Sequence, residues 1–170
     1  MKNIIFLLII LISIISCQNE NDNENQEKFF NPVNLGKLDL ANIDGFWNND
    51  SNIDTSFNGG GGVLFESHLG FIEGIGLYNE DKAVWISVFT TKDTAINAME
   101  SRINNVAAVI EKGTSDEIKG TWWVLKNSSV FVNKCNTIIE VVVFGNKNEE
   151  DGILYSTANE LARRVDNLSK

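Results

Sequence analysis

The sequence holds one imidazole and two thiols on which nucleophilic or metal chemistry would depend. His68 is the only histidine and follows Ser67 directly, and the cysteines are Cys17 and Cys135. A Ser–His–Asp or Cys–His site would have to use His68. Neighbouring residues of a strand point to opposite faces, so Ser67 and His68 lack the geometry of a catalytic pair. We predict a surface or turn role for His68, no zinc site and no disulfide framework.

Two segments carry the residue types of ligand loops. Residues 48–54 alternate Asn and Asp like a calcium loop, but the glycine and glutamate that such a loop needs are missing in either register. Residues 59–62 are four glycines without the Lys-Ser/Thr of a phosphate-binding loop. Gly70, Gly74 and Gly76 lack dinucleotide-binding spacing, and no helix starts there. We predict two solvated loops, no bound metal and no cofactor.

Three aromatic residues are the candidate ligand- or partner-binding groups: Trp122, Trp123 and Phe71. Trp122 and Trp123 are consecutive in a predicted strand, so one faces each side of the sheet. One belongs to the core, and the other lies on an open face unless a second layer, such as residues 35–47, covers it. An exposed tryptophan beside apolar groups is typical of a surface that binds a protein or stacks on a sugar.

Acidic side chains outnumber basic ones, 23 to 14, and the formal charge is −9. Binding to nucleic acid by counterion release needs a basic surface, so we predict no nucleic-acid partner. A pair of carboxylates would allow glycoside hydrolysis, but nothing in the sequence pairs two of these acids.

The elements that must position these residues begin with strands. Residues 83–90 are apolar on both faces, as in a central strand, and residues 79–82 form a hairpin turn before them. The glycines within 69–78 indicate a bulge or a close backbone approach. Further turns are expected at 127–129 and 133–136. The predicted strands are 63–65, 69–78, 83–90, 121–125, 130–132 and 138–144.

Two helices follow from apolar side chains that repeat every three or four residues. We expect Asp93 to cap the first helix and Lys112 and Gly113 to end it. The second helix has either a capping box at 157–160 or an earlier start. Residues 35–46 fit a short helix or irregular chain equally well. The two apolar stripes are Ile96, Met99, Ile103, Val106 and Ile110, and Leu154, Ala158, Leu161, Val165 and Leu168.

The element order β-β-β-α-β-β-β-α predicts an α+β domain, an antiparallel sheet of five to six strands with two helices packed on one face. Its central split β-α-β pattern is ferredoxin-like. Residues 84–168, which include a Gly-x-Trp hairpin at Gly120 and Trp122, loosely resemble uncharacterised exported bacterial domains. That resemblance implies a fold and no activity.

The amino-terminal residues have the pattern of an export signal. Lys2 precedes residues 4–15, of which 11 of 12 are apolar. This run is shorter than the roughly 20 residues that span a bilayer, and it has the length of a signal-peptide core. It ends in Ile-Ile-Ser at 14–16 and then Cys17, which resembles the lipobox of bacterial lipoproteins, although Ile14 and Ile15 depart from its commonest form. The alternatives are an ordinary secretory signal and a short membrane anchor.

The lipoprotein resemblance implies that the chain is cut before Cys17 and that Cys17 carries the lipid. Residues 17–28 after the cut hold no apolar side chain beyond the cysteine and would form a flexible tether to a single domain over 29–170. Gln18 rather than Asp after Cys17 implies the outer membrane of a Gram-negative bacterium. Cys135 is then unpaired, and we expect it to be a buried hydrophobe rather than a reactive thiol.

Together these patterns favour a non-enzymatic envelope lipoprotein, tethered to the membrane, that binds a protein or an envelope component. The binding surface would be the sheet face or the glycine-rich loop. The alternative is a small-ligand protein with an aromatic pocket for a glycan or lipid, built from Phe71 and either Trp122 or Trp123. A hydrolase that relies on carboxylates alone is a third hypothesis.

Overall fold

A computed structural model describes residues 27–43, 45–47, 65–106, 109–115, 120–125, 129–144 and 151–170. The predictions for residues 1–17, for the tether over 18–26, for the oxygen-rich segment 48–54 and for the glycines at 59–62 lie outside these ranges. The elements are η1 (Pro32–Lys37), β1 (Phe71–Tyr78), β2 (Lys82–Phe89), α3 (Lys92–Val106), β3 (Val109–Ser115), β4 (Gly120–Leu125), β5 (Ser129–Lys134), β6 (Thr137–Val143) and α4 (Asp151–Leu168).

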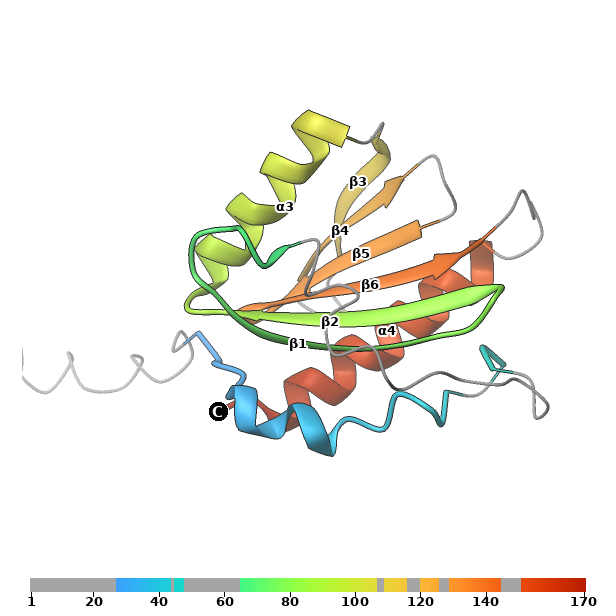
Figure 1. Ribbon diagram of the computed structural model, residues 1–170, viewed down its shortest axis with the longest axis horizontal. Coiled ribbons are helices and arrows are strands. Elements are labelled where there is room, and N and C mark those ends of the chain that lie inside the picture. The colour runs from blue at the N-terminus through green and yellow to red at the C-terminus, as the bar shows by residue number, and fades with distance from the viewer. Residues whose placement is uncertain are drawn as a thin grey trace, which may run out of the picture.

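The six strands form one antiparallel sheet in the order β1-β2-β6-β5-β4-β3 (Figure 1), which confirms the predicted α+β class. All five neighbouring pairs are antiparallel, so β2 and β3 run in the same direction. Helix α3 connects these two strands, and β6, β5 and β4 lie between them. The split β-α-β pattern is therefore present, but with three inserted strands.

The two long helices lie on opposite faces of the sheet, so the prediction that both pack on one face is wrong (Figure 1). Helix α4 packs on one side through Leu154, Ala158 and Leu161, and α3 packs on the other through Ala95 and Met99. Every residue of β5 and β6 is buried. Because β5 and β6 are buried on both faces of the sheet, each face of the sheet needs its own covering layer. Neither these helices nor the short η1 is long and apolar enough to cross a membrane.

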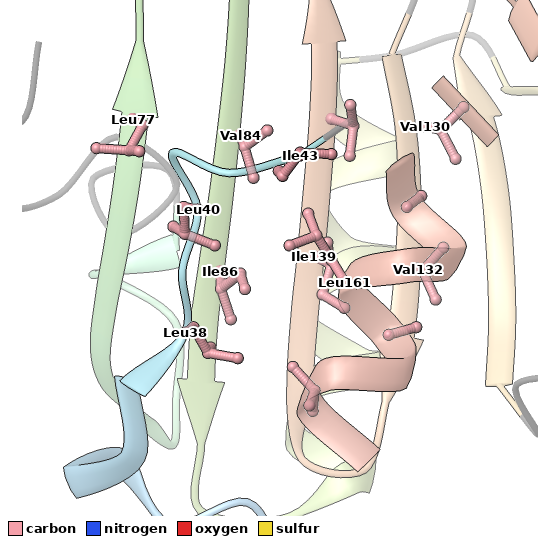
Figure 2. Packing of buried hydrophobic residues seen from close by; sticks show 14 of the residues in the cluster. Leu38, Leu40, Ile43, Leu77, Val84, Ile86, Val130, Val132, Ile139 and Leu161 are labelled. Carbon is pink, nitrogen blue, oxygen red and sulfur yellow. The ribbon is translucent and has the colours of Figure 1, made fainter. Parts of the chain in front are cut away.

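The face under α4 holds the larger hydrophobic core. Aliphatic side chains of β2, β5 and β6 interlock there with the predicted stripe of α4 (Figure 2). The amino-terminal segment lies beside α4 on this face. It is 3₁₀-helical only in η1 and irregular afterwards, which decides between the two alternatives for residues 35–46. The segment buries Leu35, Leu38, Leu40, Ile43 and Phe46.

The predicted helix over 93–110 is shorter than expected. It ends at Val106, and residues 109–115 form the edge strand β3 instead. Lys112 and Gly113 therefore pair with Trp123 and Trp122 of β4 and do not cap a helix. In sequence, Ile110 continues the apolar stripe of the helix. The backbone of its segment instead forms hydrogen bonds with β4, and such pairing between distant segments outweighs the local pattern.

The start of α3 is also capped differently from the prediction. The Thr94 amide donates to Thr91 Oγ1 at 3.1 Å, and the Thr91 amide donates to Thr94 Oγ1 at 3.0 Å. This reciprocal arrangement satisfies two otherwise orphan amides, so the capping residue is Thr91 rather than Asp93. Asp93 lies in the first turn, where its negative charge interacts favourably with the partial positive charge of the helix N-terminus.

The first two strands match their sequence patterns closely. The β1–β2 register shifts between Phe71 and Glu73, which confirms a bulge in the glycine-containing strand. Gly76 is the predicted close approach, because a Cβ there would overlap the indole ring of Trp85 on β2. Phe65, in contrast, is helical and precedes a turn over residues 66–70, and it does not belong to a strand.

The two ends of the described domain meet at one end of the sheet. Phe29 and Lys170 exchange backbone hydrogen bonds at 2.8 and 3.1 Å. The buried side chain of Asn136, in the β5–β6 turn, accepts from the Phe30 amide at 2.7 Å and donates to the carbonyls of Phe30 and Phe89 at 3.2 and 2.6 Å. We call this region, with residues 27–34, 65–72, 89–94, 134–137 and 165–170, the terminal end of the domain.

Asn136→Ala is expected to lower the free energy of unfolding by about 2 kcal/mol, because it removes three buried hydrogen bonds and leaves backbone groups without partners. Urea unfolding followed by circular dichroism measures this loss. Asn97→Ala on the exposed side of α3 is the matched control and should change stability by less than about 0.5 kcal/mol. Equal urea midpoints for the two variants would contradict a stabilising role for the hydrogen bonds of Asn136.

Candidate functional site

One row of residues crosses all six strands on the face under α3 and differs in chemistry from the rest of the sheet. Strand register places one member of the row on each strand. The row combines three aromatic rings with two charged groups, whereas the equivalent row under α4 is mostly aliphatic. The α3-side row is Gly76, Trp85, Glu140, Phe131, Trp123 and Lys112, and the α4-side row is Ile75, Ile86, Ile139, Val132, Trp122 and Gly113.

The centre of the α3-side row is a buried ion pair. Glu140 of β6 is only 4% exposed, and Arg102 of α3 lies above it with Nη2 3.7 Å from Glu140 Oε1. Burial raises the pKa of Glu140 to about 7, and the positive charge of Arg102 opposes that rise. The guanidinium also lies over the rings of Phe131 and Phe65, at 5.4 and 5.7 Å from their centroids. Arg102 thereby ties α3 to the sheet by charge and by cation–π contact.

Several polar atoms of this layer are buried without hydrogen-bond partners. They include Trp85 Nε1, Arg102 Nε, Trp123 Nε1 and Glu140 Oε2. Each buried polar atom left without a partner costs about 1–3 kcal/mol. The α3 layer is therefore held less tightly than the aliphatic layer under α4, and low local stability of this kind is typical of elements that take part in binding.

A surface hollow of about 340 Å³ lies between α3 and strands β3 and β4. Trp123 forms its floor, Ile103 and Val109 supply apolar walls, and Asn104 adds a polar group. At its rim Lys112 and Glu100 form an ion pair with 2.9 Å between Nζ and Oε1. Lys112 Nζ lies 5.4 Å from the centroid of the Trp123 ring and helps to shield it from solvent.

The structure separates the three predicted aromatic residues. Trp123 is fully buried under α3, while Trp122 lies on the opposite face, which confirms that one tryptophan faces each side. Trp122 is covered by Tyr155 of α4 at 5.8 Å between ring centroids, rather than by residues 35–47. Phe71 packs near Phe89 on the α3 side, at 6.0 Å between ring centroids. A pocket formed by Trp122 together with Phe71 is therefore ruled out by the sheet between them.

The histidine and the cysteine considered for nucleophilic chemistry lie in two separate turns. His68 lies in the turn over residues 66–70, as predicted, with its ring 5.5 Å from that of Phe65 and its Nδ1 buried without a partner. Cys135 lies in the β5–β6 turn with φ +51° and is buried, as predicted, and burial raises the pKa of its thiol. Across the described ranges no three His, Cys, Asp or Glu side chains are grouped closely enough to hold a metal ion.

Glu140, Arg102 and Trp85 were not predicted from the sequence. Glu140 could have been recognised as a candidate from the sequence, because it is the one charged residue within the apolar residues 138–144 of the last strand. A carboxylate in such a run is almost never fully buried unless it is paired. Arg102 had no comparable signal, since arginine is common on helix surfaces and its partner is 38 positions away. Comparisons with known protein families, with curated proteins and with solved structures find no match to this chain.

Proposed function

We propose that the chain is a lipid-anchored envelope protein, held at the membrane through Cys17, whose domain binds a protein or envelope component without catalysing a reaction. The observation that carries the binding role is the α3 side of the sheet, where the Trp123 hollow has an aromatic floor, apolar walls and a charged rim. An apolar hollow with a few polar groups is the usual composition of a ligand-binding site. The Arg102–Glu140 pair positions α3 beside this hollow, and Glu140 is only 4% exposed.

The anchoring part of the proposal rests on the lipobox-like residues 14–17 and the polar residues that follow them. Gln18 favours the outer membrane of a Gram-negative bacterium. Several acyl chains at Cys17 would hold the domain stably at the membrane, since one chain alone binds only reversibly.

Crosslinking in the envelope of the native host tests both parts. The unaltered chain is expected to fractionate with membranes and to capture a stoichiometric partner, and Cys17→Ala is expected to lose both. Identical soluble fractionation of the two chains would overturn the anchoring proposal.

Charge reversal at the hollow tests the binding face. Lys112→Glu removes the rim cation and should abolish capture of the partner. Arg163→Glu, on the exposed surface of α4, is the matched control and should retain it. Equal capture by both variants would mean that the partner binds elsewhere.

A small ligand is the second candidate, and the size and lining of the Trp123 hollow favour it. Small-molecule sites usually measure about 300–1,000 Å³ and combine apolar walls with a few polar groups. The Lys112–Glu100 pair that covers the ring is solvent-exposed, and exposed ion pairs are worth only about 0–1 kcal/mol, so a ligand could displace Lys112 at little cost.

Titration with cell-wall sugars and lipids, followed by tryptophan fluorescence, tests this second candidate. A saturable change is expected in the unaltered chain and in Trp122→Phe, whose indole lies on the far face. Trp123→Phe should lose it. An unchanged signal with every ligand class would leave partner binding as the function.

A further inference from the structure

Among the residues that the structure describes, the exposed large apolar side chains are concentrated at the terminal end of the domain. Among the described residues five are exposed: Phe29 at 41%, Val33 at 76%, Leu69 at 89%, Ile72 at 43% and Phe144 at 41%. The first four belong to the terminal end, and Phe144 lies at the far end of β6. Scattered exposed hydrophobics are ordinary, but four at one end need an explanation.

Contacts with neighbouring elements fix the position of each of the four. Phe29 pairs with Lys170, and Val33 lies in η1, where the Asn34 side chain donates to the Leu168 carbonyl at 3.1 Å. Leu69 precedes Gly70, whose carbonyl accepts from Thr90 at the end of β2, at 2.8 Å. Ile72 is the second residue of β1. Figure 1 shows η1, the carboxyl terminus and the start of α3 together at this end.

Electrostatics at the terminal end also differ from those of the whole chain. It holds four lysines and four acidic side chains, which are Lys28, Lys92, Lys134 and Lys170, and Glu27, Glu66, Asp93 and Asp166. Asp166 is neutralised by Lys28 and Lys134, each with Nζ 2.8 Å from a carboxylate oxygen, and Glu27 by Lys92 at 2.9 Å. In a chain of charge −9, this end would not repel an anionic surface.

The proposed anchor would bring this end close to lipid. Glu27 is ten residues after Cys17, so a fully extended chain between them spans at most about 35 Å. Tethering over such a distance gives even a weak contact a high effective concentration. Apolar side chains beside lysines are the composition of surfaces that rest in the headgroup region of a bilayer.

We propose that the terminal end of the domain docks onto the lipid bilayer, with Phe29, Val33, Leu69 and Ile72 entering the headgroup region. The proposal rests on lipid anchoring at Cys17. Docking orients the sheet so that the opposite end, with Phe144 and the β1–β2 turn, faces away from the membrane.

Amide hydrogen exchange on the acylated chain tests the docking. The protein is purified from native membranes and reconstituted into vesicles of phosphatidylethanolamine and phosphatidylglycerol. Peptides over 27–34 and 65–72 should exchange several-fold more slowly in the unaltered chain than in the double variant Val33→Asp, Leu69→Asp. Both positions are exposed, so the variant should fold normally, and unchanged exchange over residues 138–143 and 151–164 checks this.

Phe144→Asp, at the other end of the domain, is the matched control and should keep the slow exchange. Equal exchange in the unaltered chain and the double variant overturns the docking while anchoring stands, provided that the vesicles still float with the protein. A chain that does not float overturns the anchoring proposal, and the docking proposal falls with it.

Discussion

Trp123→Ala is expected to lower the free energy of unfolding by about 3–5 kcal/mol, the range seen for truncation of a buried aromatic side chain. Trp123 is 0% exposed and packs with Met99 of α3, Phe131 of β5 and Leu125 of its own strand. Its removal leaves a cavity between α3 and the sheet that these neighbours cannot fill. Because domains are stable by only about 5–15 kcal/mol, this loss is a large fraction of the total.

Urea unfolding followed by far-ultraviolet circular dichroism measures this effect as a lower midpoint. Phe144→Ala is the matched control, because Phe144 is a half-exposed aromatic residue and its truncation should cost less than about 0.5 kcal/mol. A loss below about 1 kcal/mol in Trp123→Ala would mean that α3 is not packed on the sheet as described.

Local patterns predicted most of the secondary structure. The double-sided apolar run at 83–90 became β2, and the regular stripe from Leu154 to Leu168 became α4, because burial of these side chains needs no information beyond their own segment. The same kind of pattern gave a wrong prediction at Ile110, which continues the apolar stripe of α3 but belongs to β3. The partner that decides this case is β4, and pairing between distant segments is not encoded in a local period.

The arrangement of the layers and the composition of the α3 side needed the structure. Both faces of β5 and β6 are buried, but the sequence pattern of these strands does not say which helix covers which face. The six residues of the row through Glu140 become neighbours only when all five strand pairs take their observed registers. Each register is set by a different pair of segments. Of the three predicted aromatic residues, only Trp123 lines the hollow, since neighbours in one strand diverge to opposite faces.

Stability should fall as the pH rises from about 4.5 to about 7, because the pKa of Glu140 rises from 4.5 to about 7 on folding. In this window the unfolded chain has released the proton that the folded chain retains, so the free energy of unfolding decreases with pH. The contribution of Glu140 to the free energy of unfolding is fully present below about pH 4.5 and is lost as the pH rises through about 7. It amounts to about 3 kcal/mol, since each unit of pKa corresponds to about 1.4 kcal/mol.

Urea unfolding at a series of pH values measures this slope, and two variants assign it. Glu140→Gln should remove the Glu140 contribution from the window, because the amide does not titrate. Arg102→Met should extend the fall in stability to higher pH, because the guanidinium is what opposes the rise in the Glu140 pKa.

The other perturbed carboxylate acts at a lower pH. Burial disfavours ionisation of Asp166, but hydrogen bonds and charge from Lys134 and Lys28 outweigh it and lower its pKa below 3.8. Asp166 therefore stabilises the fold above the ordinary aspartate pKa, and this contribution is lost only as the pH falls further, outside the Glu140 window. A slope between pH 4.5 and 7 that persists in Glu140→Gln would show that another group titrates there, and would contradict the raised pKa of Glu140.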